Sequence, residues 1–192
     1  MKIGYSVEGG TDRALLHGLR QRWCTGAELV EGRFRGSTGE SLRREYAKIC
    51  EEFAFKSVDV MVFLTDANDQ DWRDVQRKER SKFPSERLPL AVHGVAQRNV
   101  ECWICANPEY VANKLGIHAD ALRVANPKGC FESAMGIDRD DRKEEAISDL
   151  VKEAPLQSWL RNRSFEDFYK QVRDQSQRLL CQIENIREAP VL

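Results

Sequence analysis

An unbroken apolar run at residues 60–64 ends abruptly in a polar stretch that contains Asp66, Asn68, Asp69 and Asp71. A short run of β-branched and aromatic residues between polar turn residues is typical of a strand that is buried on both faces. Such strands belong to parallel sheets covered by helices, and ligands bind open sheets of this kind just past the carboxyl ends of the strands. We therefore expect the acids after this strand to lie at a functional edge of the molecule.

The spacing of apolar positions predicts alternating strands and helices in the first half of the chain. Strands are expected at residues 2–7, 27–34, 58–65 and 88–96, and helices at residues 12–23, 41–53, 71–82 and 109–115. This order favours an α/β fold in which about four mainly parallel strands form a sheet flanked by helices. Thr11 is the expected N-cap of the first helix, and Asp12 in its first turn suits the helix dipole.

The pattern changes in the last third of the chain, where no further strand is predicted. Short helices are expected at residues 120–124, 130–135 and 143–151, and a long final helix at residues 165–186. We therefore divide the chain into an α/β domain at residues 1–130 and a helical C-terminal extension at residues 131–192, packed on it as a cap. The final helix carries an apolar stripe, which predicts packing onto the sheet or, as the alternative, docking of a partner. The stripe consists of Phe165, Phe168, Val172, Leu179, Leu180, Ile183 and Ile186.

The composition is that of a globular protein with a highly charged surface. The 192 residues are 41% hydrophobic and 32% charged, and the net charge is −1. A nucleic-acid-binding role would therefore need a local basic surface. No apolar run approaches the ~20 residues that cross a bilayer. The six cysteines have no regular spacing and no signal peptide is recognisable, so we expect reduced thiols in a cytoplasmic protein.

The acids after different strands are expected to form one cluster. Glu8 ends the first predicted strand and Asp66 ends the third, so in a parallel sheet both emerge at the same edge. Asn68 or Asp69 would add an oxygen beside Asp66, and Glu101, after the fourth strand, would add another. Oxygen ligands of this kind suit Mg²⁺ or Mn²⁺. The alternative is an ordinary polar loop, in which Asp69 or Asp71 caps the next helix.

These motifs resemble the TOPRIM domain, a Rossmann-like α/β fold shared by topoisomerases, bacterial primases and OLD-family nucleases. That domain has a Glu after its first strand and an Asp-x-Asp after its third. The counterparts here are Glu8 in VEGGTD and Asp66-Ala67-Asn68 in FLTDAND. The sequence is more closely similar to small, stand-alone TOPRIM-like proteins encoded beside ATPases in bacterial defence loci, with Glu101-Cys102-Trp103 as a third match. The resemblance covers roughly residues 1–130, judged by the span of these motifs.

The resemblance implies a Mg²⁺- or Mn²⁺-dependent nuclease that cleaves DNA or RNA, tRNA included. Such a protein would act as the effector of an AAA- or ABC-type ATPase in anti-phage defence, away from membranes, and could form a homo-oligomer. Asn68 stands where the family has its second Asp, so the implied ligand carries one negative charge less. Asp69 would replace it if the loop turned suitably.

The implied roles extend to further residues. Asp66, with Asn68 or Asp69, would hold the cation, Glu8 would bind metal or move a proton, and Glu101 would complete a second metal position. Lys128 or Arg98 would supply a positive charge near the scissile phosphate. The residues expected to grip the nucleic-acid backbone are Arg33, Arg35, Arg43, Arg44 and Arg98.

Two other functions remain open at this point. One is a catalytically degenerate TOPRIM-like binding or regulatory subunit, which the Asn68 substitution favours. The other is a phosphohydrolase that acts on a nucleotide rather than a polymer. Cys102-x-x-Cys105 permits a zinc or redox interpretation, but without a second pair a reduced core pair is the favoured one.

Overall fold

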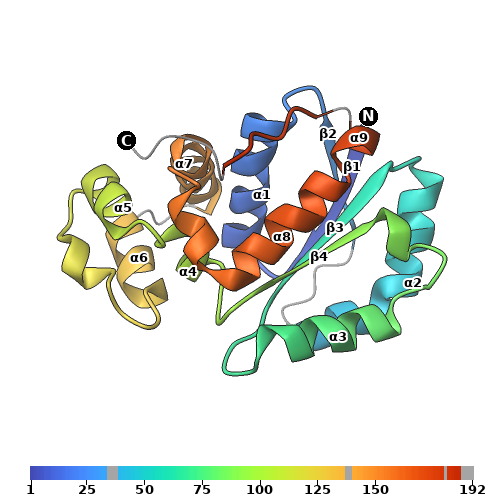
Figure 1. Cartoon of the computed structure of the whole chain (residues 1–192), viewed down its shortest axis with the longest axis horizontal. Coiled ribbons are helices and arrows are strands. Elements are labelled where there is room, and N and C mark those ends of the chain that lie inside the picture. The colour runs from blue at the N-terminus through green and yellow to red at the C-terminus, as the bar shows by residue number, and fades with distance from the viewer. Residues whose placement is uncertain (34–38, 137–139, 180, 187–192) are drawn as a thin grey trace.

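Four parallel strands form the centre of the computed structural model, which describes residues 1–33, 39–136, 140–179 and 181–186 (Figure 1). The strands are β1 (Lys2–Val7), β2 (Glu28–Glu31), β3 (Val60–Asp66) and β4 (Ala91–Ala96). Their order across the sheet is β2-β1-β3-β4, and every neighbouring pair is parallel. The predicted fold class, an α/β fold with a four-stranded parallel sheet flanked by helices, is therefore confirmed.

The strand order reverses between β1 and β3. From β1 the chain crosses to β2 on one side and then returns to β3 on the other. The register pairs Val7 with Leu64 and Asp66 with Ala96, so the carboxyl ends of β1, β3 and β4 lie side by side. In open parallel sheets, such a reversal opens a crevice at the carboxyl ends of the strands, where ligands bind.

Helices cover both faces of the sheet. On one face, α1 (Gly10–Trp23) and α8 (Arg163–Asp174) pack against the side chains of Val60, Val62 and Leu64. On the other, α2 (Gly39–Phe55) packs against Met61 and Phe63, and α3 (Trp72–Lys82) lies beside it. Because successive residues of β3 face opposite helical layers, the strand is apolar at every position rather than at every second one.

The helical C-terminal region is confirmed, although it is not a separate body. Helix α7 (Asp140–Glu153) packs along α1 so closely that a Cβ at Gly18 would lie 2.5 Å from the carbonyl oxygen of Ser148. The remaining helices are α4 (Glu101–Ile104), α5 (Pro108–Leu115), α6 (Lys128–Met135) and α9 (Ser176–Leu179), and the short 3-10 turns are Leu88–Leu90, Ala119–Ala121 and Ser158–Arg161.

The predicted single helix at residues 165–186 is wrong. Helix α8 ends at Asp174, α9 follows as a short helix, and residues 181–186 are not helical. Phe165, Phe168 and Val172 are buried in the core beside the sheet, so the core-packing interpretation of the stripe holds for α8. Leu180 lies outside the described residues.

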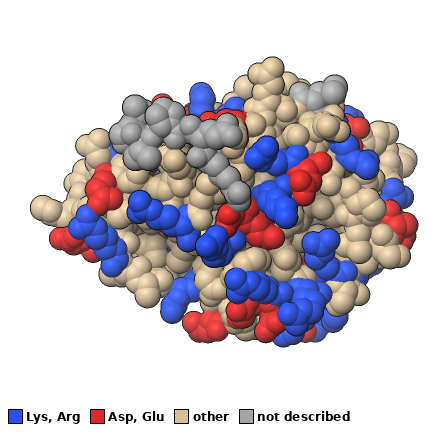
Figure 2. Space-filling view, viewed as in Figure 1, with Lys and Arg blue, Asp and Glu red and all other residues tan. Residues whose placement is uncertain are grey.

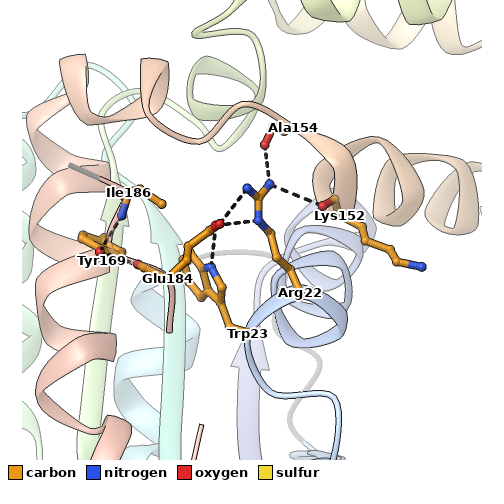
Figure 3. Close-up of polar contacts among 7 residues, drawn as sticks. All are labelled: Arg22, Trp23, Lys152, Ala154, Tyr169, Glu184 and Ile186. Atoms are coloured by element: carbon orange, nitrogen blue, oxygen red, sulfur yellow. Dashed lines mark hydrogen bonds and ion pairs between the residues drawn. The ribbon is translucent and has the colours of Figure 1, made fainter. Parts of the chain in front are cut away.

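The chain after α9 turns back over the C-terminal end of α1 (Figure 3). Cys181 forms a disulfide with Cys24, which is 157 residues earlier in the sequence. The expectation that all six cysteines are reduced is therefore wrong, because the fold brings together two cysteines that no local spacing connects. We call residues 181–186 the C-terminal strap. No described helix is long and apolar enough to span a membrane.

Candidate functional site

The acids at the ends of β1 and β3 meet, as the sequence predicts. Asp66 is the last residue of β3, and its backbone N–H donates to the Oε1 atom of Glu8 at 3.2 Å. Glu8 follows the last residue of β1 directly. This contact joins two residues that are 58 positions apart, and it lies where the strand order reverses.

Two more carboxylates complete the cluster. Glu101 begins α4, just after β4, and its side chain is 1% exposed. Asp12 lies in the first turn of α1 and accepts a hydrogen bond from the N–H of Gly9 at 2.8 Å. Gly9, not Thr11, is therefore the N-cap residue, and Asp12 supplies the capping side chain from inside the helix.

Burial and mutual repulsion raise the pKa of carboxylates in this cluster. Burial, then repulsion by Glu8 and Glu101, raises the pKa of Asp66 to about 7, while Lys128 and a backbone hydrogen bond oppose the rise. Burial, then Asp66, Glu101 and Glu8, raises the pKa of Asp12 well above its ordinary value. Each of these shifts means that negative charge is crowded into a site with little water.

Three of these carboxylates keep a buried oxygen without a partner. In the described part of the chain, Asp12 Oδ1, Asp66 Oδ1 and Glu101 Oε2 accept no hydrogen bond. The other oxygen of Glu101 lies 3.6 Å from the ammonium of Lys128. Buried acceptors are nearly always satisfied in folded proteins, so three in one cluster point to a role other than stabilising the fold.

The unpartnered oxygens belong to residues that line a cavity of about 430 Å³, which we call the carboxylate cavity. The C-terminal region forms part of its wall through Lys128 of α6 and Lys143 of α7. Glu144 of α7 also lines it and binds Arg13 of α1 at 2.8 Å. A Cβ at Gly10 would lie 2.7 Å from Glu144 Oε1, so a larger residue there would displace the end of the Glu144 side chain.

The donor set suits a hard divalent cation, although the side chains would have to move to bind one. Among the described residues, no three His, Cys, Asp or Glu side chains converge in a geometry that could hold a metal ion. Carboxylate oxygens are nevertheless the ligands that Mg²⁺ and Mn²⁺ prefer. The unpartnered oxygens of Asp12, Asp66 and Glu101 could turn toward a common cation.

The predicted ligands after Asp66 do not line the carboxylate cavity. Asn68 and Asp69 are exposed. Asn68 adopts a left-handed backbone conformation, with φ of 52°, and its N–H donates to the carbonyl of Arg98, which carries the chain away from the cavity. Asp71 accepts from the N–H of Arg73 and caps α3, so the polar-loop interpretation holds for this residue.

The arginines predicted to bind nucleic acid are not gathered around the cavity. Arg33 and Arg44 are exposed and lie near Glu52 and Glu40, and Arg43 turns inward to Glu79. Arg98 has φ of 66° and forms an isolated antiparallel bridge with Asn68. Arg35 lies outside the described residues. On the face drawn in Figure 2, basic and acidic side chains are interspersed.

Asp12 is the site residue that the sequence analysis assigned only to the helix dipole. Asp12 closes the VEGGTD segment that carries the TOPRIM resemblance, and this was the available signal. Comparisons with the profiles of known protein families, with curated proteins and with solved structures find no match. The TOPRIM resemblance therefore stays a prediction from the motifs alone.

Proposed function

We propose that this protein is a metal-dependent hydrolase of phosphodiester bonds in DNA or RNA. The observation that supports this proposal is that Asp12, Asp66 and Glu101, each with an unpartnered buried oxygen, line one cavity at the crevice where the strand order reverses. Burying several like charges is costly unless something compensates for them. A divalent cation with a phosphate group bound beside it would do so.

The residues in and beside the cavity would have different roles. Asp12, Asp66 and Glu101 would hold the cation, and Glu8 would stay fixed by the N–H of Asp66. Mg²⁺ or Mn²⁺, when bound, would polarise the phosphate and stabilise charge on the leaving oxygen. Lys128, 3.6 Å from Glu101 and partly exposed, would place a positive charge next to the substrate phosphate.

A catalytically inactive subunit is less well supported than it was from the sequence. That alternative depended on Asn68 replacing an acidic ligand, but Asn68 is exposed and does not line the cavity. Asp12 also lines the cavity, and its carboxylate offsets the ligand that the inactive-subunit alternative regards as lost. An ATPase partner and a role in phage defence follow from the resemblance alone, and we keep them as predictions.

A nucleotide phosphohydrolase is the second candidate, because α7 forms part of the cavity wall and limits its size. A volume of about 430 Å³ lies in the range of small-molecule sites. Arg43, which would grip a polymer, is instead paired with the buried Glu79. A single nucleotide would fill the cavity without needing a longer basic track.

Cleavage assays with three substrates would test both candidates. Supercoiled plasmid, tRNA and a chromogenic nucleotide phosphodiester would each be incubated with Mg²⁺ or Mn²⁺ and the full chain. Asp66→Asn and Glu101→Gln should lower activity by about a hundredfold or more, since each removes charge that acts in the transition state. Asp149→Asn, an exposed change of the same net charge on α7, is the matched control.

The substrate profile would separate the candidates. Cleavage of plasmid or tRNA supports the nuclease, whereas activity on the small ester alone supports the phosphohydrolase. If no substrate is cleaved, or if Asp66→Asn retains full activity, the proposed function is wrong.

A further inference from the structure

A fully buried glutamate lies behind the carboxylate cavity, on the opposite face of β3. Glu79 projects from α3 and is 0% exposed. Its Oε1 atom accepts a hydrogen bond from the hydroxyl of Thr65 at 2.6 Å. Thr65 is also fully buried and immediately precedes Asp66. Because neighbouring residues of a strand point to opposite faces, Thr65 faces α3 while Asp66 faces the cavity.

Arg43 of α2 compensates the charge of this glutamate. Its Nη1 atom lies 3.5 Å from Glu79 Oε1, the oxygen that Thr65 also contacts. Arg43 is therefore committed to an internal partner, which is why it does not serve as the nucleic-acid contact that the sequence suggested. Within the described residues, Glu79 Oε2 is buried and accepts no hydrogen bond.

Packing of α3 does not by itself explain a carboxylate at this position. Burial raises the pKa of Glu79 to about 7, although the Thr65 hydroxyl and Arg43 oppose the rise and Glu8 adds to it. An apolar side chain of similar size would usually pack with less cost than a buried ion pair. Since Glu8 acts on Glu79, the buried pair also lies within electrostatic reach of the cavity.

We propose that Glu79, held by Arg43, is a positioning residue for Asp66 and acts through the hydroxyl of Thr65. This inference rests on the proposed function, because it assigns Asp66 to a metal site. Fixing the Thr65 side chain fixes the end of β3, from which Asp66 directs its carboxylate into the cavity and its N–H to Glu8. Groups that orient metal ligands in this way typically change metal affinity by about 10- to 100-fold.

Titration of the full chain with Mn²⁺, followed by calorimetry, tests the proposal without an activity assay. Glu79→Leu and Thr65→Val each remove one side of the hydrogen bond, and each should weaken Mn²⁺ binding about tenfold. The double variant should bind no more weakly than either single variant, because both remove the same interaction. Glu79→Gln keeps an acceptor oxygen for Thr65 and should stay within about twofold of the wild type, since its hydrogen bond survives.

Val75→Ala is the matched control for loosening of α3. Val75 is buried on the same helix and has no hydrogen-bonding side chain, so this variant should lower the melting temperature and leave Mn²⁺ affinity unchanged. If Val75→Ala weakens binding as much as Glu79→Leu, general loosening explains the effect and the inference is wrong.

The remaining outcomes separate this inference from the proposed function. If folded Glu79→Leu and Thr65→Val bind Mn²⁺ as the wild type does, the positioning role fails while the metal site stands. If the wild type binds no Mn²⁺, the metal site and the positioning role fail together.

Discussion

The two ends of α1 differ in how far their polar side chains are paired. At its N-terminal end, Asp12 stands among other carboxylates and keeps one buried oxygen without a partner. At its C-terminal end, Arg22 donates to the carbonyls of Lys152 and Ala154 and to both oxygens of Glu184 (Figure 3). One helix thus joins an end where like charges crowd together to an end where charges are paired.

At the C-terminal end of α1, which we call the strap end, the charged groups are paired, although the side-chain oxygen of Asn185 in the strap is buried and accepts no hydrogen bond. Trp23 Nε1 also donates to Glu184 at 3.1 Å, and the hydroxyl of Tyr169 donates to the Glu184 carbonyl and accepts from the N–H of Ile186. Satisfied polar networks of this kind stabilise one packing arrangement, whereas unsatisfied buried groups cost stability. The difference is consistent with a strap end that stabilises the fold, and it is at the N-terminal end of α1, the acid end, that we propose a ligand binds.

The largest expected effect is at the strap end. Cys181→Ser removes the disulfide with Cys24 and should lower the free energy of unfolding by about 2 to 5 kcal/mol. Urea denaturation would measure the loss, and a reducing agent should have the same effect on the wild type. Cys130→Ser, at an exposed free cysteine, is the control. Equal stability of Cys181→Ser and wild type would show that the strap does not stabilise the fold.

The next effect separates a partly buried ion pair from an exposed one. Arg22→Met removes the donor to two carbonyls and leaves Glu184 with Trp23 as its remaining donor, which should cost about 2 kcal/mol, a typical value for hydrogen bonds to charged groups. Arg123→Met breaks an exposed pair with Glu109 and Asp120 and should change stability little. Thermal melting of both variants would compare them. A loss no larger in Arg22→Met than in Arg123→Met would contradict the contrast between the two ends of α1.

Most features of the fold that depend on the local pattern of apolar residues were predicted correctly from the sequence. The apolar run of β3 and the alternation of strands and helices predicted the parallel sheet, and the parallel sheet brought Glu8, Asp66 and Glu101 together. Some boundaries of helices and strands differ from the prediction because of local residue preferences. For example, β4 begins at Ala91 because the segment with Pro89 forms a 3-10 turn.

Long-range pairings that do not follow from the order of the strands could not be read from the sequence. Cys24 and Cys181 meet only because the chain turns back after α9, and Arg43 turns inward only because Glu79 is buried opposite it. Asn68 was placed at the site by its nearness to Asp66 in the sequence, yet the backbone turns it outward. In each case the deciding partner lies on another element.

At the acid end, neutralising one charge should raise stability rather than lower it. Asp12→Asn keeps an oxygen for the N–H of Gly9 and gives an amide that can donate to neighbouring carboxylates. Without divalent cations, the free energy of unfolding should rise by about 1 to 2 kcal/mol, as expected when an unsatisfied buried group is relieved. Asp149→Asn, an exposed change of the same charge, should have little effect. A destabilised Asp12→Asn variant would mean that the carboxylate contributes to folding.

The smallest expected effect is a pH dependence, and its sign follows from the direction of the shifts. The pKa of both Asp66 and Glu79 is raised to about 7 in the folded protein, mainly by burial, so folding favours their protonated forms. The stability they contribute is present at low pH and is lost as the pH rises through about 7. His93 works the other way, because burial lowers its pKa to about 3 and stability is lost below the ordinary histidine pKa of about 6.5.

Above that value the contribution of His93 levels off, which fixes the window for the measurement. Between about pH 6.5 and 8, the free energy of unfolding without divalent cations should fall by about 1 kcal/mol. Saturating Mg²⁺ should raise the melting temperature more at the upper end of this range, where Asp66 is ionised, than at the lower end. Asp66→Asn should flatten the pH profile and remove the response to Mg²⁺. If the free energy of unfolding rises with pH instead, other groups of the protein compensate the charges of the carboxylates at the acid end, as Arg22 does for Glu184 at the strap end.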